Sequence, residues 1–416
     1  MAVLLRLPTE IKALVFQELP SRDLLSIRRA CKILRDSAAS LFIQSYFKTR
    51  YVMFERRSLE TLLDISKHVN FAPHINTLEF DLYHLLPLDE VVEIQPPFSP
   101  YEKMMTRTAS ENKGNDSNNS IDSTSSQDNH LSRLNEGAYR NQWNDQHQLM
   151  RAQYALDCLT MAMLNLSQCK NITFDDSNRP WGLGSVEVKV GILPQRSLTF
   201  DSNTSVRLVR HILDIVLSAA VASKIEIEDL DISAGCSMEN ANRVSPDMLP
   251  RLSAPITSLR HLRLVLDPDF PESVYSGDWE VNLVQFIHSF PELTHFVLGF
   301  ENRDEFFRFS EASPSIYIPK LENLVIGLVD CTSDEVAGFL VRHRETLREI
   351  SFDSVDLTDG LMAWQILIQK IHDELNITYL SMIDSMARGR DVQDREPLEA
   401  TDRRGLIEII DRLQEP

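Results

Sequence analysis

The chain has 416 residues, of which 43% are hydrophobic and 25% are charged, a composition typical of a globular protein with roughly two to four domains and contrary to wholesale disorder. Its 42 Lys and Arg against 61 Asp and Glu leave a formal net charge of −19. A general nucleic-acid binder is therefore not expected, because such proteins neutralise phosphates with basic side chains.

The five cysteines predict neither disulfides nor a metal site. They are odd in number and far apart, and none follows another at the two-residue interval that zinc sites use. The N-terminal residues lack a basic region followed by an apolar run, and no stretch approaches the ~18 apolar residues of a membrane span. We expect free thiols, no cofactor, and a cytoplasmic or nuclear protein outside the membrane.

Charge divides the chain into two regions. Residues 1–70 hold 12 Lys and Arg against 7 Asp and Glu, which leaves 30 against 54 for residues 71–416. Helical patterns fill the first region over Thr9–Leu19, from Pro20 to Cys31, and over Lys32–Phe47. Three short helices bury too little surface to be stable alone. We expect one apolar face of the first helix to serve an internal core, and another to contact either a partner protein or the residues that follow.

An ordered series of short motifs gives the first region a family resemblance. The motifs are Leu7-Pro8-Thr9-Glu10-Ile11, Val15-Phe16, Leu19-Pro20, Asp23-Leu24-Leu25, Ile27-Arg28, Cys31-Lys32 and Leu34-Arg35. In order and spacing they closely resemble the F-box domain. The layout of the chain is similar to that of F-box proteins of filamentous fungi.

The F-box resemblance implies docking to the Skp-type adaptor, and through it to the cullin–RING subunits, of an SCF ubiquitin ligase. The basic cluster Arg28, Arg29, Lys32 and Arg35 then steers the adaptor or forms a solvated helix face, which we prefer to a nucleic-acid patch. The residues carried over as adaptor-binding, in the interface or in its supporting core, are Leu7, Pro8, Ile11, Phe16, Leu24, Leu25 and Ile27.

The second region carries a loose repeat. Eight segments share the pattern Leu-x-x-Leu-x-Leu with conservative replacements, and from Ile227 onward their starts lie 32, 34, 28, 26 and 30 residues apart. Such strand patterns at such periods are typical of leucine-rich repeats, and helical patterns lie between most of them. The segments are Ile75-Leu78-Phe80, Cys169-Ile172-Phe174, Ile227-Leu230-Ile232, Leu259-Leu262-Leu264, Leu293-Phe296-Leu298, Leu321-Leu324-Ile326, Leu347-Ile350-Phe352 and Ile377-Leu380-Met382.

These patterns predict an α/β fold with an N-terminal three-helix F-box (1–47), followed by an irregular leucine-rich-repeat-like solenoid of alternating strands and helices (48–383). An ordinary α/β domain with βαβ units is the alternative. In both cases the strands are parallel neighbours, because their connections are too long for hairpins. Residues 102–133 are expected to form a disordered insert rich in polar side chains, and residues 384–416 a mobile stretch with a short helix.

Two-residue alternation places the residues between the buried positions of each strand on the concave side of the solenoid. This polar row is either a target-recognition surface or a neutral solvated face. Its candidate target-binding residues are His261, Arg263, His295, Asn323, Glu349 and Tyr379.

Signatures of catalysis are missing from the sequence, since no Gly-x-Ser-x-Gly elbow occurs and the eleven His show no metal-binding spacing. We therefore expect a substrate receptor, and not an enzyme, that joins the adaptor to an unknown protein target. The target should be basic if the concave face shares the acidic charge of its region. The alternatives are an F-box scaffold that assembles a complex without directing ubiquitination, and an enzyme with an acidic site.

Overall fold

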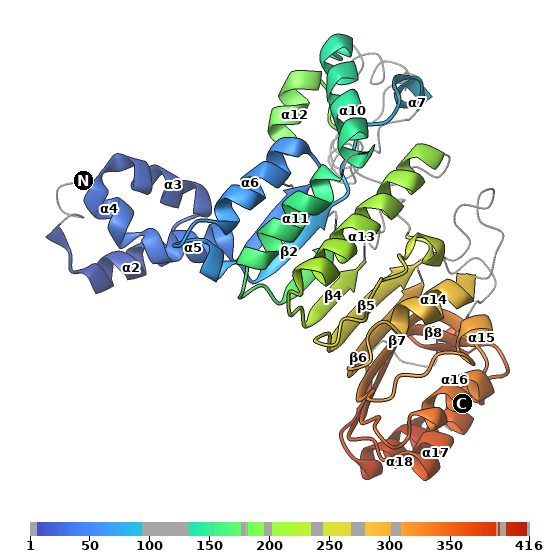
Figure 1. Cartoon of the computed structure of the whole chain (residues 1–416). Helices are drawn as coiled ribbons and strands as arrows, with labels where there is room; N and C mark the ends of the chain where they lie inside the picture. Colours follow the sequence, from blue (N-terminus) through green and yellow to red (C-terminus); the bar gives the residue numbers. More distant parts are fainter. Residues whose placement is uncertain are drawn as a thin grey trace, which may run out of the picture.

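One continuous β-sheet runs through the molecule, with a group of short helices at its N-terminal end (Figure 1). The coordinates are a computed structural model that describes residues 6–93, 133–151, 153–175, 180, 182–194, 202–233, 244–267, 279–300, 309–387, 390–391 and 397–413. The predicted insert at 102–133 lies almost wholly outside these described residues.

Four helices precede the sheet, namely α2 (Thr9–Gln17), α3 (Ser21–Ala30), α4 (Lys32–Ser37) and α5 (Ala39–Phe47). The expected third helix is therefore two helices. It is interrupted at Ala38, whose φ of −92° and ψ of 0° leave the helical region. Ala38 is buried in the core of the first helices, while α5 continues toward the sheet. The interruption lets one apolar segment serve two different cores.

The described strands form a single 12-stranded sheet in which β1 to β9 are parallel neighbours in chain order. Short strands complete its C-terminal end: β10 pairs with β8 and β11, and β12 pairs antiparallel with β9. The strands are β1 (Thr49–Met53), β2 (Thr77–Asp81), β3 (Asn171–Phe174), β4 (Asp229–Ile232), β5 (His261–Leu266), β6 (His295–Phe300), β7 (Asn323–Cys331), β8 (Glu349–Leu357), β9 (Tyr379–Ile383), β10 (Met386–Ala387), β11 (Arg390–Asp391) and β12 (Leu398–Ala400).

The eight predicted strand segments coincide with β2 to β9, and their apolar positions are all buried. The prediction of parallel neighbouring strands is thus confirmed. Strand β1 was missed, because its inward position is occupied by Arg50, which aligns with Leu78 of β2 and interrupts the apolar pattern. Burial lowers the pKa of Arg50 to about 10.

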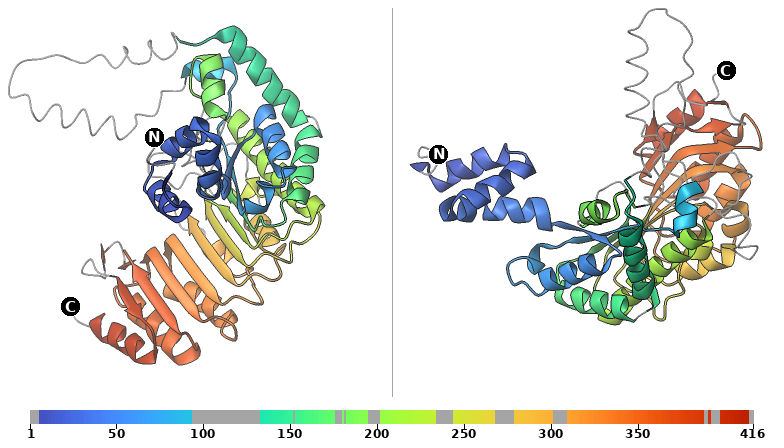
Figure 2. Two further views of the ribbon diagram at one scale, coloured as in Figure 1. Left: turned by 90° about the vertical axis from the view of Figure 1, so that its left-hand side faces the viewer. Right: turned by 90° about the horizontal axis from the view of Figure 1, so that it is seen from above.

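Most of the helices cover one face of the sheet (Figure 2). The helices are α6 (Arg56–Ser66), α7 (Leu88–Glu93), α10 (Glu136–Arg151), α11 (Tyr154–Asn165), α12 (Leu183–Val190), α13 (Asn203–Ser223), α14 (Trp279–Ile287), α15 (Phe309–Ala312), α16 (Ser333–Arg342), α17 (Ala363–Glu374) and α18 (Arg403–Arg412), with 3-10 turns η1 (Ala72–His74) and η2 (Pro246–Met248). The other face is largely bare of helices, and α12 reaches it near β1, where Leu183 packs with Met53 and Tyr83. The apolar sides of most helices and the inward side chains of the strands form one large core, whereas side chains of α7, α10 and α12 form a second cluster.

The C-terminal segment is packed on the sheet in its described parts. The short helix expected here is α18, which buries Leu406, Ile409 and Ile410. The stretch before it is not simply mobile, because β12 pairs with β9. The physical reason is the apolar spacing of α18, which gives this short helix one side that contacts the core. Asp402 caps α18 by accepting a hydrogen bond from the Gly405 backbone N–H at 2.8 Å.

A buried polar link joins the end of β2 to the start of α13. His84 is 1% exposed and lies 2.7 Å from both the Leu82 carbonyl oxygen and the Ser205 hydroxyl. Because a carbonyl can only accept, Nδ1 of His84 donates to Leu82, and its unprotonated Nε2 accepts from Ser205. Burial lowers the pKa of His84 to about 4, so the ring is neutral near pH 7.

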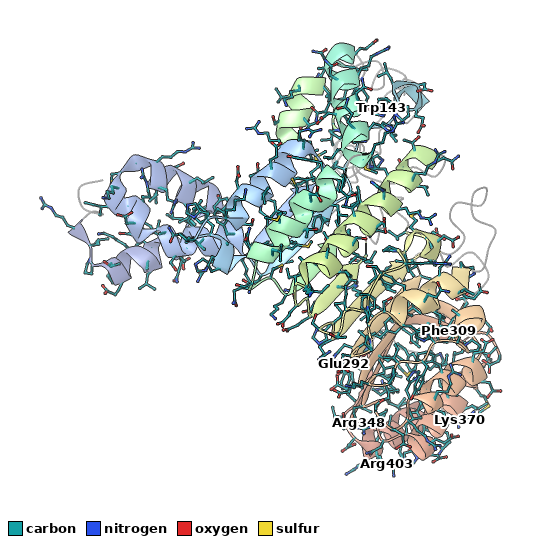
Figure 3. All side chains as sticks on the ribbon, viewed as in Figure 1. Trp143, Glu292, Phe309, Arg348, Lys370 and Arg403 are labelled. Carbon is teal, nitrogen blue, oxygen red and sulfur yellow. The ribbon has the colours of Figure 1, made fainter. Side chains whose placement is uncertain are left out.

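Charged side chains line the edge of the sheet where the parallel strands begin. Glu292 and Arg348, which precede β6 and β8, both lie along this edge (Figure 3). Glu292 accepts from Lys320 Nζ at 2.6 Å, and a guanidinium nitrogen of Arg260 lies 3.7 Å from the same carboxylate. The ion pair lowers the pKa of Glu292. The edge is therefore solvated and charged, unlike the core.

Candidate functional site

Helix α2 has apolar residues on two sides, and only one of them is buried. Lys12 and Phe16 are 6% and 0% exposed, and Phe16 belongs to the small core of the first helices. Ile11, Leu14 and Val15 are 43%, 58% and 39% exposed. At about 100° per residue these three side chains share an arc of roughly 100°. We call Ile11, Leu14 and Val15 the α2 face, an exposed apolar surface of the kind that binds proteins.

The predicted adaptor-binding residues are divided between this surface and two cores. The exposed ones lie in the α2 face or next to it in sequence, and the buried ones support the α2 face from within. Ile27 packs against the core of the first helices, and Leu25 against the large core of the sheet. Pro8 and Ile11 are exposed, Leu7, Leu25 and Ile27 are half-buried, and Phe16 and Leu24 are buried.

Two members of the α2 face were not among the predicted contact residues. Leu14 and Val15 lie three and four positions after Ile11, and this spacing is the signal that assigns all three to one helix face. Ile33 of α4 is 56% exposed and was not among the predicted residues either. It is a lone exposed apolar residue in a short helix, so the sequence offered no periodic signal for it.

Aromatic contacts attach the first helices to the sheet region. The Arg28 guanidinium of α3 lies 3.8 Å from the centre of the Phe42 ring in α5. Phe47 at the end of α5 stacks on Phe71 with ring centroids 4.3 Å apart, and both Phe42 and Phe47 belong to the large core. Burial lowers the pKa of Arg28, with Arg35 adding repulsion. The helices that carry the α2 face are therefore held on the sheet region by packed side chains.

The bare face of the sheet is a row of aligned side chains, which we call the open face. It consists of the strand positions that alternate with the buried ones. Sheet register places the predicted target-binding residues in two adjacent lines across the strands. The first line contains His261, His295, Asn323, Glu349 and Tyr379, and the second contains Arg263.

Two pairs of neighbouring residues in the first line contact one another, and the residues at its ends contact Asp229 and Glu399. His261 Nδ1 pairs with Asp229 Oδ1, and the His261 and His295 rings meet edge to face with centroids 4.3 Å apart. Further along, Asn323 donates to Glu349 Oε2 at 2.6 Å. Tyr379 then donates from its hydroxyl to Glu399 at 3.1 Å. The polar row predicted from alternation is thus continuous in space, although its members are far apart in sequence.

The open face is acidic toward its N-terminal half. Burial raises the pKa of Tyr51, and the nearby charges of Glu79 and Asp175 raise it further. Asp175 is also close enough to Asp231 to act on its charge. Burial raises the pKa of Asp231, while Arg263 opposes that shift. These three carboxylates therefore outnumber the one basic side chain among them, Arg263. This half of the open face attracts cationic groups.

His295 lies in the middle of the row beside His261. Burial lowers the pKa of His295, and His261 lowers it further, against the opposing charges of Glu322, Glu349 and Asp229. His295 is therefore neutral at pH 7. Its neighbouring carboxylates keep this part of the open face acidic.

The described residues contain no group of three or more His, Cys, Asp or Glu arranged to hold a metal ion. Among the helices of the described parts, none combines the length and apolar character needed to cross a membrane. Four cysteines in those parts, Cys31, Cys158, Cys169 and Cys331, are free thiols. Burial raises the pKa of Cys169 to about 11, which makes its thiolate scarce at neutral pH.

Comparison with known protein families identifies one domain. Residues 4–43 match the family model of the F-box domain, which confirms the resemblance found in the sequence motifs. This segment contains α2, α3 and α4 and the first part of α5. No curated protein matches the chain. An F-box domain indicates an SCF-type adaptor role through binding of a Skp-type protein.

Proposed function

We propose that this chain is the substrate-receptor subunit of an SCF-type cullin–RING ubiquitin ligase, and the α2 face is the observation that carries the proposal. A Skp-type adaptor would cover Ile11, Leu14 and Val15, together with Leu7 and Pro8. Burial of apolar surface contributes roughly 25 cal/mol per Å², so an adaptor groove that excludes water stabilises the complex. The exposed Arg29, Lys32 and Arg35 supply a basic rim that steers an acidic partner.

The sheet region supports the second half of the proposal, the recruitment of a target. We propose that residues 48–383 are an irregular leucine-rich-repeat-like solenoid whose open face binds a protein. Its acidic half, in which Asp175 and Asp231 are half-buried and Glu79 is buried, favours a target with a basic surface. Such a contact weakens as salt rises, because exposed charges are screened over about 8–10 Å near physiological ionic strength.

The proposed mechanism is proximity without chemistry in this chain. The F-box holds the ligase and the open face holds the target, so tethering raises the effective concentration of the target's lysines beside the conjugating enzyme. We also propose that the chain works in the cytoplasm or the nucleus, where a reducing environment keeps thiols such as Cys158, Cys169 and Cys331 free.

Adaptor docking is tested by co-expressing the full chain with a Skp-type adaptor and purifying through this chain. We expect the adaptor to co-purify with the wild type and to be lost with Ile11→Asp plus Val15→Asp, because the substitutions charge the α2 face without entering a core. Phe16→Asp is unsuitable, since Phe16 is fully buried and its loss would unfold the helices. The matched control is Val69→Asp plus Val188→Asp, at sites 81% and 84% exposed elsewhere.

Adaptor docking is refuted if the wild type fails to capture the adaptor or the α2-face variant still captures it. Target recruitment is tested separately by proximity labelling with the wild type and the α2-face variant. A labelled protein that accumulates in cells carrying the variant is a substrate, as the proposal requires. A labelled protein whose turnover is unchanged identifies a scaffold instead.

A further inference from the structure

The helix-covered side of the sheet contains a cavity of about 580 Å³ that neither proposed binding surface uses. It lies between α13, the η2 turn and α14, on the opposite side of the sheet from the open face. Basic side chains dominate its wall: Arg207, Arg210 and His211 come from α13, and Arg251 comes from the segment after η2. All three arginines are exposed enough to meet a ligand.

Helical spacing places the α13 side chains on one side of the helix. Arg207, Arg210 and His211 lie three and four positions apart, so they project from one arc roughly 100° wide. The opposite side of α13 carries Val209, Ile212 and Val216, all fully buried against the sheet. The basic side chains are thus presented on a rigid helix, and the core fixes their direction.

Hydrogen bonds organise the opposite wall. Arg251 donates to Asn282 Oδ1 at 3.2 Å, and Asn282 donates from Nδ2 to Asp247 Oδ1 at 2.6 Å. One oxygen of the Asp247 carboxylate is therefore already engaged, and Arg251 is positioned by a neutral amide. A guanidinium with remaining N–H donors is suited to bidentate contact with a tetrahedral anion.

The charge balance of the cavity is opposite to that of its surroundings. Three arginines line it against two carboxylates, Asp214 and Asp247, in a region where acidic residues outnumber basic ones. His211 adds a polar atom, because its buried Nε2 has no hydrogen-bond partner among the described residues. This concentration of cationic donors around a hollow favours an anion with several acceptor oxygens.

We propose that this cavity binds a phosphate monoester, with the phosphate held by Arg207, Arg210 and Arg251. The volume lies within the roughly 300–1,000 Å³ of small-ligand sites, so it holds the phosphate and the group that carries it. Asp214 and the second oxygen of Asp247 accept hydrogen bonds from hydroxyl or amide donors of that group. Both a phosphorylated side chain of a protein and a free phosphorylated metabolite have this chemistry.

The test is isothermal titration of the purified full chain with N-acetyl-phosphoserine amide, glucose 6-phosphate and inorganic phosphate, beside the unphosphorylated N-acetyl-serine amide and glucose. We expect the phosphorylated probes alone to bind, and Arg207→Gln plus Arg251→Gln to weaken them at least about tenfold, because each lost guanidinium removes charge-assisted hydrogen bonds. Tighter binding of the phosphoserine probe identifies a protein source, and tighter binding of the sugar phosphate identifies a metabolite.

The matched control is Arg344→Gln plus Arg404→Gln, which removes the same charge from two exposed sites far from the cavity in sequence and should leave the affinity unchanged. Circular dichroism melting verifies that both double variants are folded. The proposal is overturned by three outcomes: no phosphorylated probe binds, the unphosphorylated probes bind equally well, or the two double variants lose affinity equally. Loss of adaptor docking would leave this test unaffected, because the α2 face is not part of the cavity.

Discussion

The F-box helices and the sheet region bury apolar side chains on different scales. The core of the F-box helices contains four buried residues, Phe16, Leu24, Leu34 and Ala38, whereas the core of the sheet region extends without interruption from Phe42 to Ile410. The exposed surfaces of the two regions also differ in polarity. The F-box helices expose the apolar α2 face, whereas the sheet exposes a polar row. The first region would gain stability from a partner that covers the α2 face, because apolar surface would then leave water. The second buries a large core of its own and presents charged and hydrogen-bonding side chains on its open face.

The largest effect should come from the core of the sheet region. Phe296→Ala removes a ring that is 1% exposed between β5 and β7, and we expect the free energy of unfolding to fall by about 3–5 kcal/mol. Ile11→Ala should change it by no more than about 0.5 kcal/mol, because Ile11 is on the surface. Equilibrium urea unfolding followed by circular dichroism measures both.

A surface control in the sheet region is Val281→Ala, at a site that is 40% exposed. It should behave like Ile11→Ala in urea but leave adaptor capture intact. If Ile11→Ala lowered the free energy of unfolding as much as Phe296→Ala does, the α2 face would be part of a core. The comparison of the two regions would then fail.

Acid should affect the sheet region more than the F-box helices. Burial lowers the pKa of His84 to about 4 in the folded state, so the unfolded chain binds the proton more tightly. The neutral His84 ring contributes on the order of 3 kcal/mol to the free energy of unfolding. This contribution is fully present above pH ~6.5 and is lost as the pH falls toward 4. No histidine occurs before His68, so the F-box helices have no matching transition.

The measurement for His84 is a series of urea unfolding curves between pH 7 and pH 4 for the wild type and His84→Asn. The substitution keeps a donor for the Leu82 carbonyl but cannot titrate in this range. The variant should therefore show a shallower fall in stability with decreasing pH. Parallel pH profiles for the two proteins would show that His84 is not the titrating group.

The smallest effect concerns the junction between the two regions. Arg28→Gln removes the cation that lies over the Phe42 ring, and we expect a loss of about 1 kcal/mol in the free energy of unfolding. Limited proteolysis should cut the F-box helices of this variant sooner than those of the wild type. Arg29→Gln, the exposed neighbour, is the control and should match the wild type in both measurements. Equal behaviour of the two variants would show that α5 alone holds the regions together.

Local patterns predicted most of the sheet and failed where a single residue departed from them. The apolar positions of β2 to β9 were identified because alternation determines which side chains face inward. Strand β1 was missed since Arg50 occupies an inward position. The expected third helix was interrupted at Ala38, whose backbone depends on packing between two cores and not on helix propensity. For α18, apolar spacing predicted the helix but did not indicate that a surface was available to receive it.

In the candidate site, too, local sequence patterns predicted some features and tertiary packing decided the others. The sequence motifs identified the F-box domain, and alternation identified the residues of the open face. Nothing in the sequence decided that Phe16 would be buried and Val15 exposed, because both are apolar and only tertiary packing selects the buried side of α2.

The sequence by itself determined the identity of the F-box segment, the repeated strands and the side on which each strand is buried, because these depend on spacings of a few residues. Tertiary structure alone decided which residues became neighbours across the molecule. Sheet register placed His261 beside His295 across 34 residues, and the packing of α13 against η2 brought Arg207 and Arg251 to one cavity. Such contacts depend on the way in which long connections bring distant segments together, and on which surfaces remain to be covered. Local periodicity encodes neither of these.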